Sequence, residues 1–266
     1  MSTAATPASP LRPDELFSCS GQVAIVTGAT SGIGRASAEA LAAAGARVLI
    51  AGLADADPHA VAARLVATGL DVAGIACDVT SADAPQQLVS AAVDRWGRLD
   101  TVVCNAGAAL DDPRAPGLVD ALDRMQDLHV RSVVRLARAA LPVMSDTGGG
   151  AFIIMSSIAG LRGNLVLSGY GVTKAANAQI ARNIAVQWGP SGVRANAISP
   201  GVIETEFARP ITDDASVAAT RRDRTPLRRF GRVEEVAGAV VWLASPAGAF
   251  VSGQNIVIDG GTMISD

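Results

Sequence analysis

The chain has 266 residues, of which 49% are hydrophobic and 18% charged, so it holds enough apolar material for the core of one large domain. The formal net charge of −3 provides no basic surface for nucleic acid, and no apolar stretch approaches the roughly 20 residues that span a membrane. Three scattered cysteines (Cys19, Cys77, Cys104) and two histidines (His59, His129) argue against a disulfide framework and a metal site. These features predict a reduced, cytoplasmic protein that binds neither nucleic acid nor membrane.

Residues 1–20 are rich in Ser, Ala and Pro and show no periodicity. They also lack the basic start and the long apolar stretch of a signal peptide. We predict that residues 1–20 are a disordered N-terminal extension. A single folded domain, without internal repeats or an interdomain linker, is expected over residues 21–266.

Within that domain, short β-branched runs alternate with amphipathic stretches of helical length. The predicted strands are Val23–Thr27, Arg47–Ala51, Val72–Cys77, Leu99–Cys104, Ala151–Ser156, Arg194–Ile198 and Asn255–Ile258. The predicted helices lie near residues 33–44, 59–69, 83–96, 120–144, 170–189 and 233–245. Because the strands are nearly all apolar, we expect helices on both faces of the sheet. The pattern predicts an α/β fold with a doubly wound, seven-stranded parallel sheet in a three-layer sandwich.

Three glycines, Gly28, Gly32 and Gly34, join the first predicted strand to the first predicted helix. In such a turn Gly28 permits the tight bend, Gly32 lets backbone N–H groups approach a pyrophosphate, and Gly34 allows close packing of helix on strand. The N-terminus of the following helix adds partial positive charge that attracts an anion. The turn is therefore predicted to bind a dinucleotide.

Tyr170 is the single tyrosine of the chain, and Lys174 is its single lysine beside 21 arginines. A step of four residues in a helix turns about 400°, so the two side chains share one face. In a chain that uses Arg for nearly every positive charge, a retained Lys indicates a place that needs a compact ammonium of adjustable pKa. Coincidence explains either residue alone, but it explains the pair poorly.

These features resemble the short-chain dehydrogenase/reductase family over essentially all of residues 21–266. The shared motifs are the glycine turn, Asp78 after the third strand, Asn105-Ala106-Gly107 after the fourth, Ser157 thirteen residues before Tyr170, the Tyr170-x-x-x-Lys174 motif, Pro200-Gly201 with Thr205, and the closing Asp259-Gly260-Gly261. The resemblance implies a Rossmann-type fold and an NAD(P)-dependent oxidoreductase. It further implies a short-chain alcohol dehydrogenase or carbonyl reductase that acts on a secondary alcohol or a ketone, a small-molecule substrate.

The same resemblance carries site residues onto this chain. The residues expected to contact the dinucleotide are Gly28, Thr30, Ser31, Gly32, Ile33, Gly34, Leu53, Asp78, Val79, Asn105, Ala106, Gly107, Tyr170, Lys174, Pro200, Gly201, Ile203 and Thr205. Asp78 is expected at the adenine, and Thr205 at the nicotinamide carboxamide and phosphates.

Ser157, Tyr170 and Lys174 are the expected catalytic residues. A free tyrosine has a pKa near 10, and lowering it by about 3 units takes roughly 4 kcal/mol of differential stabilisation. The Lys174 ammonium and a cationic nicotinamide ring would both favour the tyrosinate. Ser157 would hold the substrate oxygen within reach of Tyr170. Taken alone, Ser157 has another interpretation, a strand-end serine that caps its own turn.

One position departs from the family, because His129 stands where a catalytic Asn is expected. The family's Asn is thought to act largely through its backbone carbonyl, which holds a water in a proton relay to the lysine. His129 retains a carbonyl, and an imidazole with a pKa near 6.5 could join the relay. The simpler interpretation is a spacer that fills the Asn site. This departure also motivates an alternative function, a dinucleotide-binding regulator without turnover.

The cofactor is predicted from the end of the second strand. NAD enzymes of the family usually carry an Asp there, whereas NADP enzymes carry an Arg one residue on or a basic residue before the second glycine. This chain has Gly52, Leu53 and Ser31 at those places, so neither pattern is met. Because a 2′-phosphate would lack a placed cation, we predict NAD, with NADP as the alternative.

Residues 203–230 show the least regular pattern and are too long for an ordinary connection, so we predict a substrate lid. The substrate pocket should draw on this segment together with Ala108–Pro116 and Leu161–Leu167. A cluster of arginines at 221, 222 and 224 could touch substrate, although a solvated surface is the simpler interpretation.

Two partner hypotheses complete the predictions. Arg131, Arg135 and Arg138 form a helical stripe that could dock an acidic carrier, as in an NADP-dependent 3-oxoacyl-carrier-protein reductase; a solvated or subunit-facing edge is the simpler interpretation. Family members are usually tetramers, and the small residues that follow Lys174 permit close helix approach. We therefore predict a homotetramer.

Overall fold

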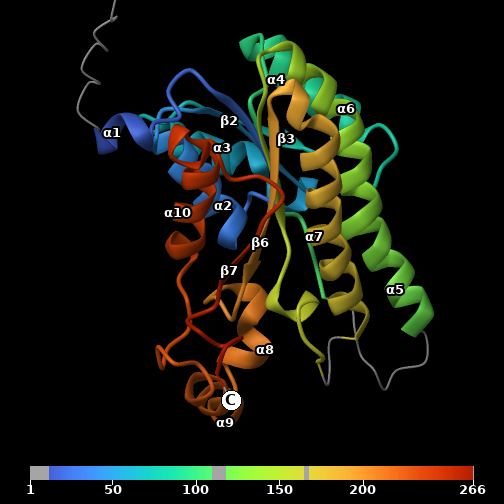
Figure 1. Cartoon of the computed structure of the whole chain (residues 1–266), viewed down its shortest axis with the longest axis vertical. Coiled ribbons are helices and arrows are strands. Elements are labelled where there is room, and N and C mark those ends of the chain that lie inside the picture. The colour runs from blue at the N-terminus through green and yellow to red at the C-terminus, as the bar shows by residue number, and fades with distance from the viewer. Residues whose placement is uncertain (1–11, 110–117, 165–167, 266) are drawn as a thin grey trace, which may run out of the picture.

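The computed structural model describes residues 12–109, 118–164 and 168–265, and Figure 1 shows how their elements are arranged. The strands are β1 (Val23–Thr27), β2 (Arg47–Gly52), β3 (Val72–Ala76), β4 (Thr101–Cys104), β5 (Gly150–Met155), β6 (Val193–Pro200) and β7 (Asn255–Ile258). The α-helices are α1 (Pro13–Leu16), α2 (Gly32–Ala43), α3 (Pro58–Val66), α4 (Ala84–Trp96), α5 (Leu118–Gln126), α6 (Ser132–Asp146), α7 (Ser168–Trp188), α8 (Arg209–Thr212), α9 (Ala215–Asp223) and α10 (Val233–Ala244). Short helical turns are η1 (Ala54–Ala56), η2 (Asp127–Arg131), η3 (Ile158–Gly160), η4 (Gly189–Ser191), η5 (Glu206–Ala208) and η6 (Pro246–Gly248).

The seven strands form one parallel sheet in the order β3-β2-β1-β4-β5-β6-β7. The chain moves outward in one direction after β1 and in the other after β4, so these neighbours mark the switch point of the sheet. Ligands of such sheets bind in the crevice beyond the carboxyl ends of the strands at this point. The predicted Rossmann-type, doubly wound fold is confirmed.

Two apolar layers hold the sheet between its helices. One core cluster joins the sheet to α4, α6 and α7, and the other joins it to α2, α3 and α10. Figure 1 shows these two helical layers on opposite sides of the strands. All five residues of β1 are buried, as expected for a strand covered on both faces. No helix in the described ranges has the length and apolar character needed to cross a membrane.

The structure corrects two of the sequence predictions. The folded part begins before residue 21, because α1 is helical and Cys19 is fully buried, with its N–H donating to Ala44 O at 2.8 Å. The predicted extension over residues 1–11 lies outside the described residues. The predicted helix over 120–144 is three elements, because the π-helical turn η2 separates α5 from α6.

Residues 203–230 contain local order that the sequence pattern did not indicate. The segment forms η5, α8 and α9, and Asp214 caps α9 by accepting hydrogen bonds from the N–H groups of Ser216 and Val217. In Figure 1, α8 and α9 lie at the end of the molecule where α7 begins. The predicted lid therefore lies at the carboxyl end of the sheet.

Candidate active site

A cleft of about 590 Å³ lies at the switch point of the sheet. Its walls are the turns that follow the strands, the start of α7 and the segment from β6 to α9. Every residue predicted to contact the dinucleotide lines this cleft except Gly34, which lies behind the turn. Ser157 lines it as well, so residues from the turns after six strands, β1 to β6, meet in one place.

The glycine turn has the backbone shape that its sequence predicted. Gly28 and Gly32 have φ angles of +62° and +53°, which only glycine adopts readily. A Cβ on Gly34 would lie 2.2 Å from the carbonyl oxygen of Gly28 and 2.4 Å from the amide nitrogen of Asn105. That Asn105 amide donates to Gly28 O at 3.0 Å and Thr27 O at 3.1 Å, so it ties the turn to β4.

The turn is shaped to hold a diphosphate. Ser31, the N-cap of α2, makes no side-chain hydrogen bond to the first turn of the helix, whose N–H groups therefore face the cleft without a cap. The methyl group of Thr205 lies across the cleft, 3.4 Å from the place that a Cβ on residue 32 would take. A side chain at residue 32 would therefore narrow the space for a ligand. These residues fit a bound dinucleotide.

The adenosine end of the cleft carries no basic side chain among the described residues. Gly52 fills the family's acidic position, and a Cβ there would lie 2.5 Å from the methyl group of Thr30. Leu53 is exposed beside it, and Asp78 accepts hydrogen bonds from the N–H and hydroxyl of Thr80 at 2.9 and 2.8 Å. The cationic side chains among the described lining residues are Lys174 on α7, Arg162 after η3 and Arg221 on α9.

Tyr170 and Lys174 lie on one buried face of α7. Burial raises the pKa of Tyr170 to about 12, and a hydrogen bond with the Ser157 side chain offsets part of the rise. The Lys174 Nζ lies 5.4 Å from the centre of the Tyr170 ring and donates to Met155 O at 2.8 Å. Burial also lowers the pKa of Lys174 to about 8. Without a nicotinamide, burial thus outweighs the Ser157 hydrogen bond, and the lowered pKa of Tyr170 beside a cationic nicotinamide stays a prediction.

Ser157 has both roles that the sequence left open. Its hydroxyl accepts a hydrogen bond from Ala159 N–H at 3.1 Å, which caps η3, and its side chain also bonds to Tyr170. The capping bond fixes the Ser157 rotamer, so the hydroxyl that faces Tyr170 is held in place by its own turn.

His129 lies inside the π-helical turn η2, buried against Tyr170. Its Nε2 accepts a hydrogen bond from Ala108 N–H at 3.1 Å, so the ring proton lies on Nδ1, which bonds to Thr173 Oγ1 at 2.8 Å. The Thr173 hydroxyl in turn donates to Tyr170 O at 2.9 Å. Burial is the main cause that lowers the pKa of His129 to about 3, with the Lys174 charge second. The imidazole is therefore neutral and joins the loop after β4 to the first turn of α7.

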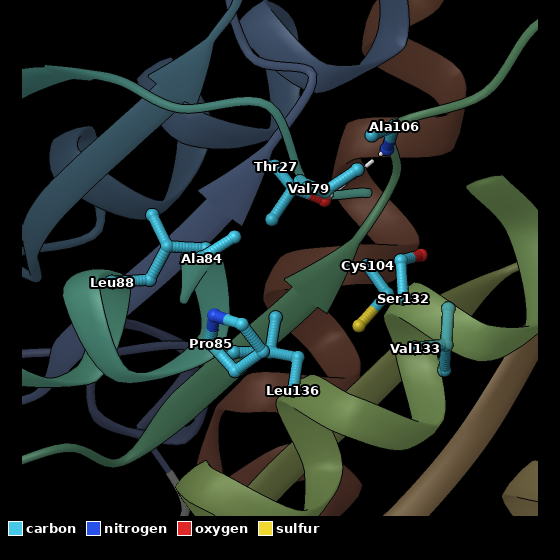
Figure 2. A pocket seen from close by; sticks show the side chains of 10 residues that line it. All are labelled: Thr27, Val79, Ala84, Pro85, Leu88, Cys104, Ala106, Ser132, Val133 and Leu136. Carbon is cyan, nitrogen blue, oxygen red and sulfur yellow. Dashed lines mark hydrogen bonds between the residues drawn. The ribbon is translucent and has the colours of Figure 1, made fainter. Parts of the chain in front are cut away.

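A second, much smaller space of about 10 Å³ adjoins the cleft between β4, α4 and α6. Figure 2 shows the mainly apolar side chains around it, with the hydrogen bond from Ala106 N–H to Thr27 Oγ1 at its rim. It has room for one water molecule at most. Burial raises the pKa of Cys104 in its wall, so this thiol is unreactive. Across the described residues, no three His, Cys, Asp or Glu side chains gather as a metal site requires.

Comparisons with known proteins agree with this geometry. Residues 28–263 match the family model described as "Enoyl-(Acyl carrier protein) reductase". The dehydrogenase/reductase SDR family member 4 of Bos taurus is 33% identical over 248 residues, which cover 91% of this chain and 87% of that protein. This chain is a short-chain dehydrogenase/reductase. As a member of that family it is an oxidoreductase that uses NAD(P) and acts on a small molecule.

Two further relatives extend the comparison. A tropinone reductase homolog of Arabidopsis thaliana is 34% identical to this short-chain dehydrogenase/reductase over 253 residues, covering 95% of this chain and 82% of the relative. The crystal structure of a gluconate 5-dehydrogenase from Burkholderia cenocepacia J2315 in complex with NADP and tartrate aligns with a TM-score of 0.91. Its sequence is 29% identical, and the alignment covers 96% of this chain and all of the other.

Three residues of the site, Thr173, Met155 and Phe207, were not predicted individually from the sequence. Thr173 and Met155 hold His129 and Lys174, and Phe207 lies with its ring centre 6.0 Å from that of Tyr170. A signal existed for Thr173, which lies three residues after Tyr170 and so on the same helix face. No local signal identifies Met155, because its backbone carbonyl is the acceptor. The parts of the predicted substrate pocket at residues 110–116 and 165–167 lie outside the described residues.

Proposed function

We propose that this protein interconverts a secondary alcohol and a ketone with NAD as cofactor and Tyr170 as the acid–base group. The observation that carries the proposal is Tyr170, which is buried in the cleft, bonded to Ser157 and has the Lys174 ammonium 5.4 Å from the centre of its ring. A bound nicotinamide would supply the hydride acceptor or donor for the substrate's carbinol carbon. The chain must then supply a proton donor, a support for the substrate oxygen and a shield from water.

Tyr170 suits the reductive direction at neutral pH. With a pKa of about 12 it holds its proton, which it can give to the ketone oxygen as hydride reaches the carbon. Ser157 donates to the same oxygen, and its cap on η3 keeps the donor in place. In the oxidative direction Tyr170 must first lose its proton, and the Lys174 ammonium stabilises the resulting tyrosinate. The proposed reaction therefore favours reduction at neutral pH and oxidation at high pH.

We further propose that His129 is a positioning residue. Both ring nitrogens are occupied, one by Ala108 N–H and the other by the Thr173 hydroxyl. A pKa near 3 keeps the ring neutral across the physiological range. These contacts support a tether that orients the start of α7, and they favour the spacer interpretation over a proton carrier.

The preference for NAD is argued from the adenosine end of the cleft. A 2′-phosphate carries nearly two negative charges and needs a guanidinium or ammonium close by. Arg35 is exposed outside the cleft, and Arg47, at the far end of β2, donates to Gly21 O. Gly52 and Leu53 carry no charge, so they neither attract nor repel a 2′-phosphate. We therefore propose a moderate preference for NAD rather than a strict one.

The direct test is an assay of the purified protein with NADH and NADPH over a panel of ketones, and with both oxidised cofactors over the matching alcohols. Cofactor-dependent turnover with NADH preferred is the expected result. Tight binding of NADH with no turnover of any compound would instead support the regulator hypothesis, and a clear NADPH preference would overturn the cofactor assignment alone.

The carrier-protein alternative has weaker support from the arginine stripe on α6 and η2. Arg131 pairs with Asp127 at 2.8 Å, and Arg135 donates to Thr80 O at 3.1 Å. Two of the three guanidiniums thus already have partners within the protein. A substrate panel that includes 3-oxoacyl thioesters, free and carrier-bound, separates this function from the proposed one.

Exposed apolar side chains support the proposed homotetramer. Phe250 and Ile264 are almost fully exposed near β7, and Val186 and Val172 are exposed on α7. Apolar surface of this kind is usually covered by another subunit. Light scattering at micromolar concentration should give four times the 26.9 kDa chain mass, and a stable monomer would sink the proposal.

A further inference from the structure

Two arginines from distant parts of the chain line the substrate end of the cleft. Arg162 follows η3, and Arg221 lies in the last turn of α9, 59 residues later. Figure 1 shows α9 at the end of the molecule where α7 begins, so both reach the cleft from the carboxyl end of the sheet. They lie near enough that the Arg162 charge, after burial, lowers the pKa of Arg221.

Neither guanidinium has a counter-ion within the part of the chain that is described. The six ion pairs there involve other arginines, and neither side chain hydrogen-bonds to a described residue. Of the neighbouring arginines, Arg222 lies over the Phe230 ring at 5.4 Å and Arg228 donates to Asp223 O. Arg224, whose charge also acts on Arg221, does not line the cleft. The two positive charges repel each other, and an anion bound between them would relieve that repulsion.

The carboxylates that line the cleft do not neutralise this pair. Asp78 lies at the adenosine end and bonds to Thr80. Glu206 lies nearer the substrate end, but it pairs with Arg209 at 3.3 Å and its side chain is 77% exposed. Among the described residues that line the substrate end, the positive charges therefore outnumber the negative ones, since Lys174 also lines it.

Apolar side chains accompany Tyr170 and the two arginines in this half of the cleft. Phe207 lies against the Tyr170 ring, and Ile211, Ile158 and Ala159 line the wall with it. A ligand that reached from Tyr170 to the guanidiniums would thus have one reactive oxygen, an apolar stem and an anionic end. Guanidinium forks pair most closely with planar carboxylates.

We propose that Arg162 and Arg221 bind a carboxylate of the substrate, so that the natural substrates are oxo and hydroxy acids whose carboxylate is separated from the reacting carbon by an apolar stem. The proposal rests on the alcohol–ketone chemistry proposed above for Tyr170. The carboxylate site adds the substrate class to that chemistry. It also gives the substrate a second contact with the protein, away from the carbon that exchanges hydride.

The test compares straight-chain oxo-carboxylic acids with their methyl esters, which keep the ketone and stem but lose the charge. Wild-type protein with NADH should reduce the acids with a kcat/KM about tenfold or more above the esters, mainly through KM. Arg221→Gln should lower kcat/KM for the acids by about ten- to a hundredfold and leave the esters unchanged. Arg162→Gln should act in the same direction, and Arg221→Lys should retain more activity toward acids than Arg221→Gln.

Arg222→Gln is the matched control, since it removes the same charge one residue along α9 from a side chain outside the cleft. Equal effects of Arg221→Gln and Arg222→Gln would mean a general change of surface charge and would overturn the site. Equal use of acids and esters by the wild type would overturn it too, while leaving the alcohol–ketone function intact. An unchanged Kd for NADH in Arg221→Gln verifies that the variant is folded.

If the protein reduces no ketone at all, the proposed function is wrong. The carboxylate site is then tested by ligand binding alone. In that case the oxo acids should still raise the thermal midpoint of the wild-type protein with NADH, but not that of Arg221→Gln. The same midpoint shift in both, or in neither, rejects the carboxylate site.

Discussion

The two halves of the cleft are built in different ways. The dinucleotide half is made of backbone and small side chains: the glycine turn, the Asn105 amide that ties it to β4, and the uncharged pair Gly52 and Leu53. The substrate half is made of long or ionisable side chains, Tyr170 and Lys174 on α7 and the two arginines of the proposed carboxylate site. On the proposed function, the first half would recognise its ligand by shape and N–H groups, and the second by charge and proton position. Substitutions in one half should therefore leave the other largely intact.

The largest expected effect is on turnover in the substrate half. Tyr170→Phe removes only the phenolic hydroxyl, so kcat for ketone reduction should fall by about 10²–10⁴, the range for a lost general acid. Steady-state kinetics with NADH measure it. Retention of more than a tenth of wild-type kcat would rule Tyr170 out as the proton donor.

Lys174→Arg should have a smaller but clear effect. The guanidinium keeps the charge but is too wide to donate to Met155 O from the same place, so kcat should fall by up to about 10²-fold. The cation also moves away from Tyr170, so the tyrosinate is less stabilised and the alkaline rise of alcohol oxidation should shift to higher pH. Full activity with an unchanged pH profile would mean that the single lysine of the chain is accidental.

The parts of the site that the sequence predicted depend on residues close together in the chain, and the parts that it did not predict depend on residues far apart. The glycine turn and the Tyr170–Lys174 pair were predictable because each depends on local spacing within one turn or helix, and Ser157 was predicted from the family's spacing of thirteen residues before Tyr170. The His129 tether was not predictable, because its partners lie far from it in the chain. Ala108 lies 21 positions before His129 and Thr173 lies 44 positions after it, and the π-helical turn that holds His129 has no compositional signal. That Arg162 and Arg221 line the same cleft was likewise hidden, since they lie 59 residues apart in the chain.

The fold was predicted more completely than the boundaries of the folded part. Alternating apolar runs and amphipathic stretches specify the seven strands and the doubly wound order, because both sheet faces are buried. The segment from residue 12 to 20 was assigned to the extension on composition. Its burial depends on one side chain, Cys19, which packs in the core beside α2 and α10, a contact that composition does not reveal.

His129 links the two halves, and its titration should be visible in stability rather than in activity. Below about pH 6.5 the unfolded chain takes up a proton on His129, whereas the folded protein does so only near pH 3. Stability is therefore fully present above about pH 6.5 and falls as the pH drops through this window, by about 1.4 kcal/mol per pH unit.

The measurement is urea unfolding of the wild type, His129→Asn and His59→Asn between about pH 7 and about pH 5. In His129→Asn the free energy of unfolding should no longer show this part of its dependence on pH, whatever the stability of the variant at neutral pH. His59 is exposed, so His59→Asn is the matched control and should keep the wild-type slope. Equal slopes in all three proteins would show that His129 is not the group responsible.

The smallest expected effect lies in the dinucleotide half. Leu53→Arg places a guanidinium beside the adenosine end without disturbing the glycine turn, so NADPH affinity should improve by about tenfold, the value of one partly exposed charged hydrogen bond. NADH affinity should change little, and turnover of the best ketone with NADH should stay near the wild-type value. An unchanged ratio of the NADPH and NADH affinities would mean that the adenosine 2′-hydroxyl of the cofactor does not lie beside residue 53.

The separation of the two halves is tested most directly by the Kd for NADH of Tyr170→Phe, measured by fluorescence titration beside the wild type. We expect a value within about threefold of wild type, although the same variant has lost at least about 10² in turnover. A Kd that rises in parallel with the loss of turnover would contradict it, because Tyr170 would then serve mainly to bind the cofactor.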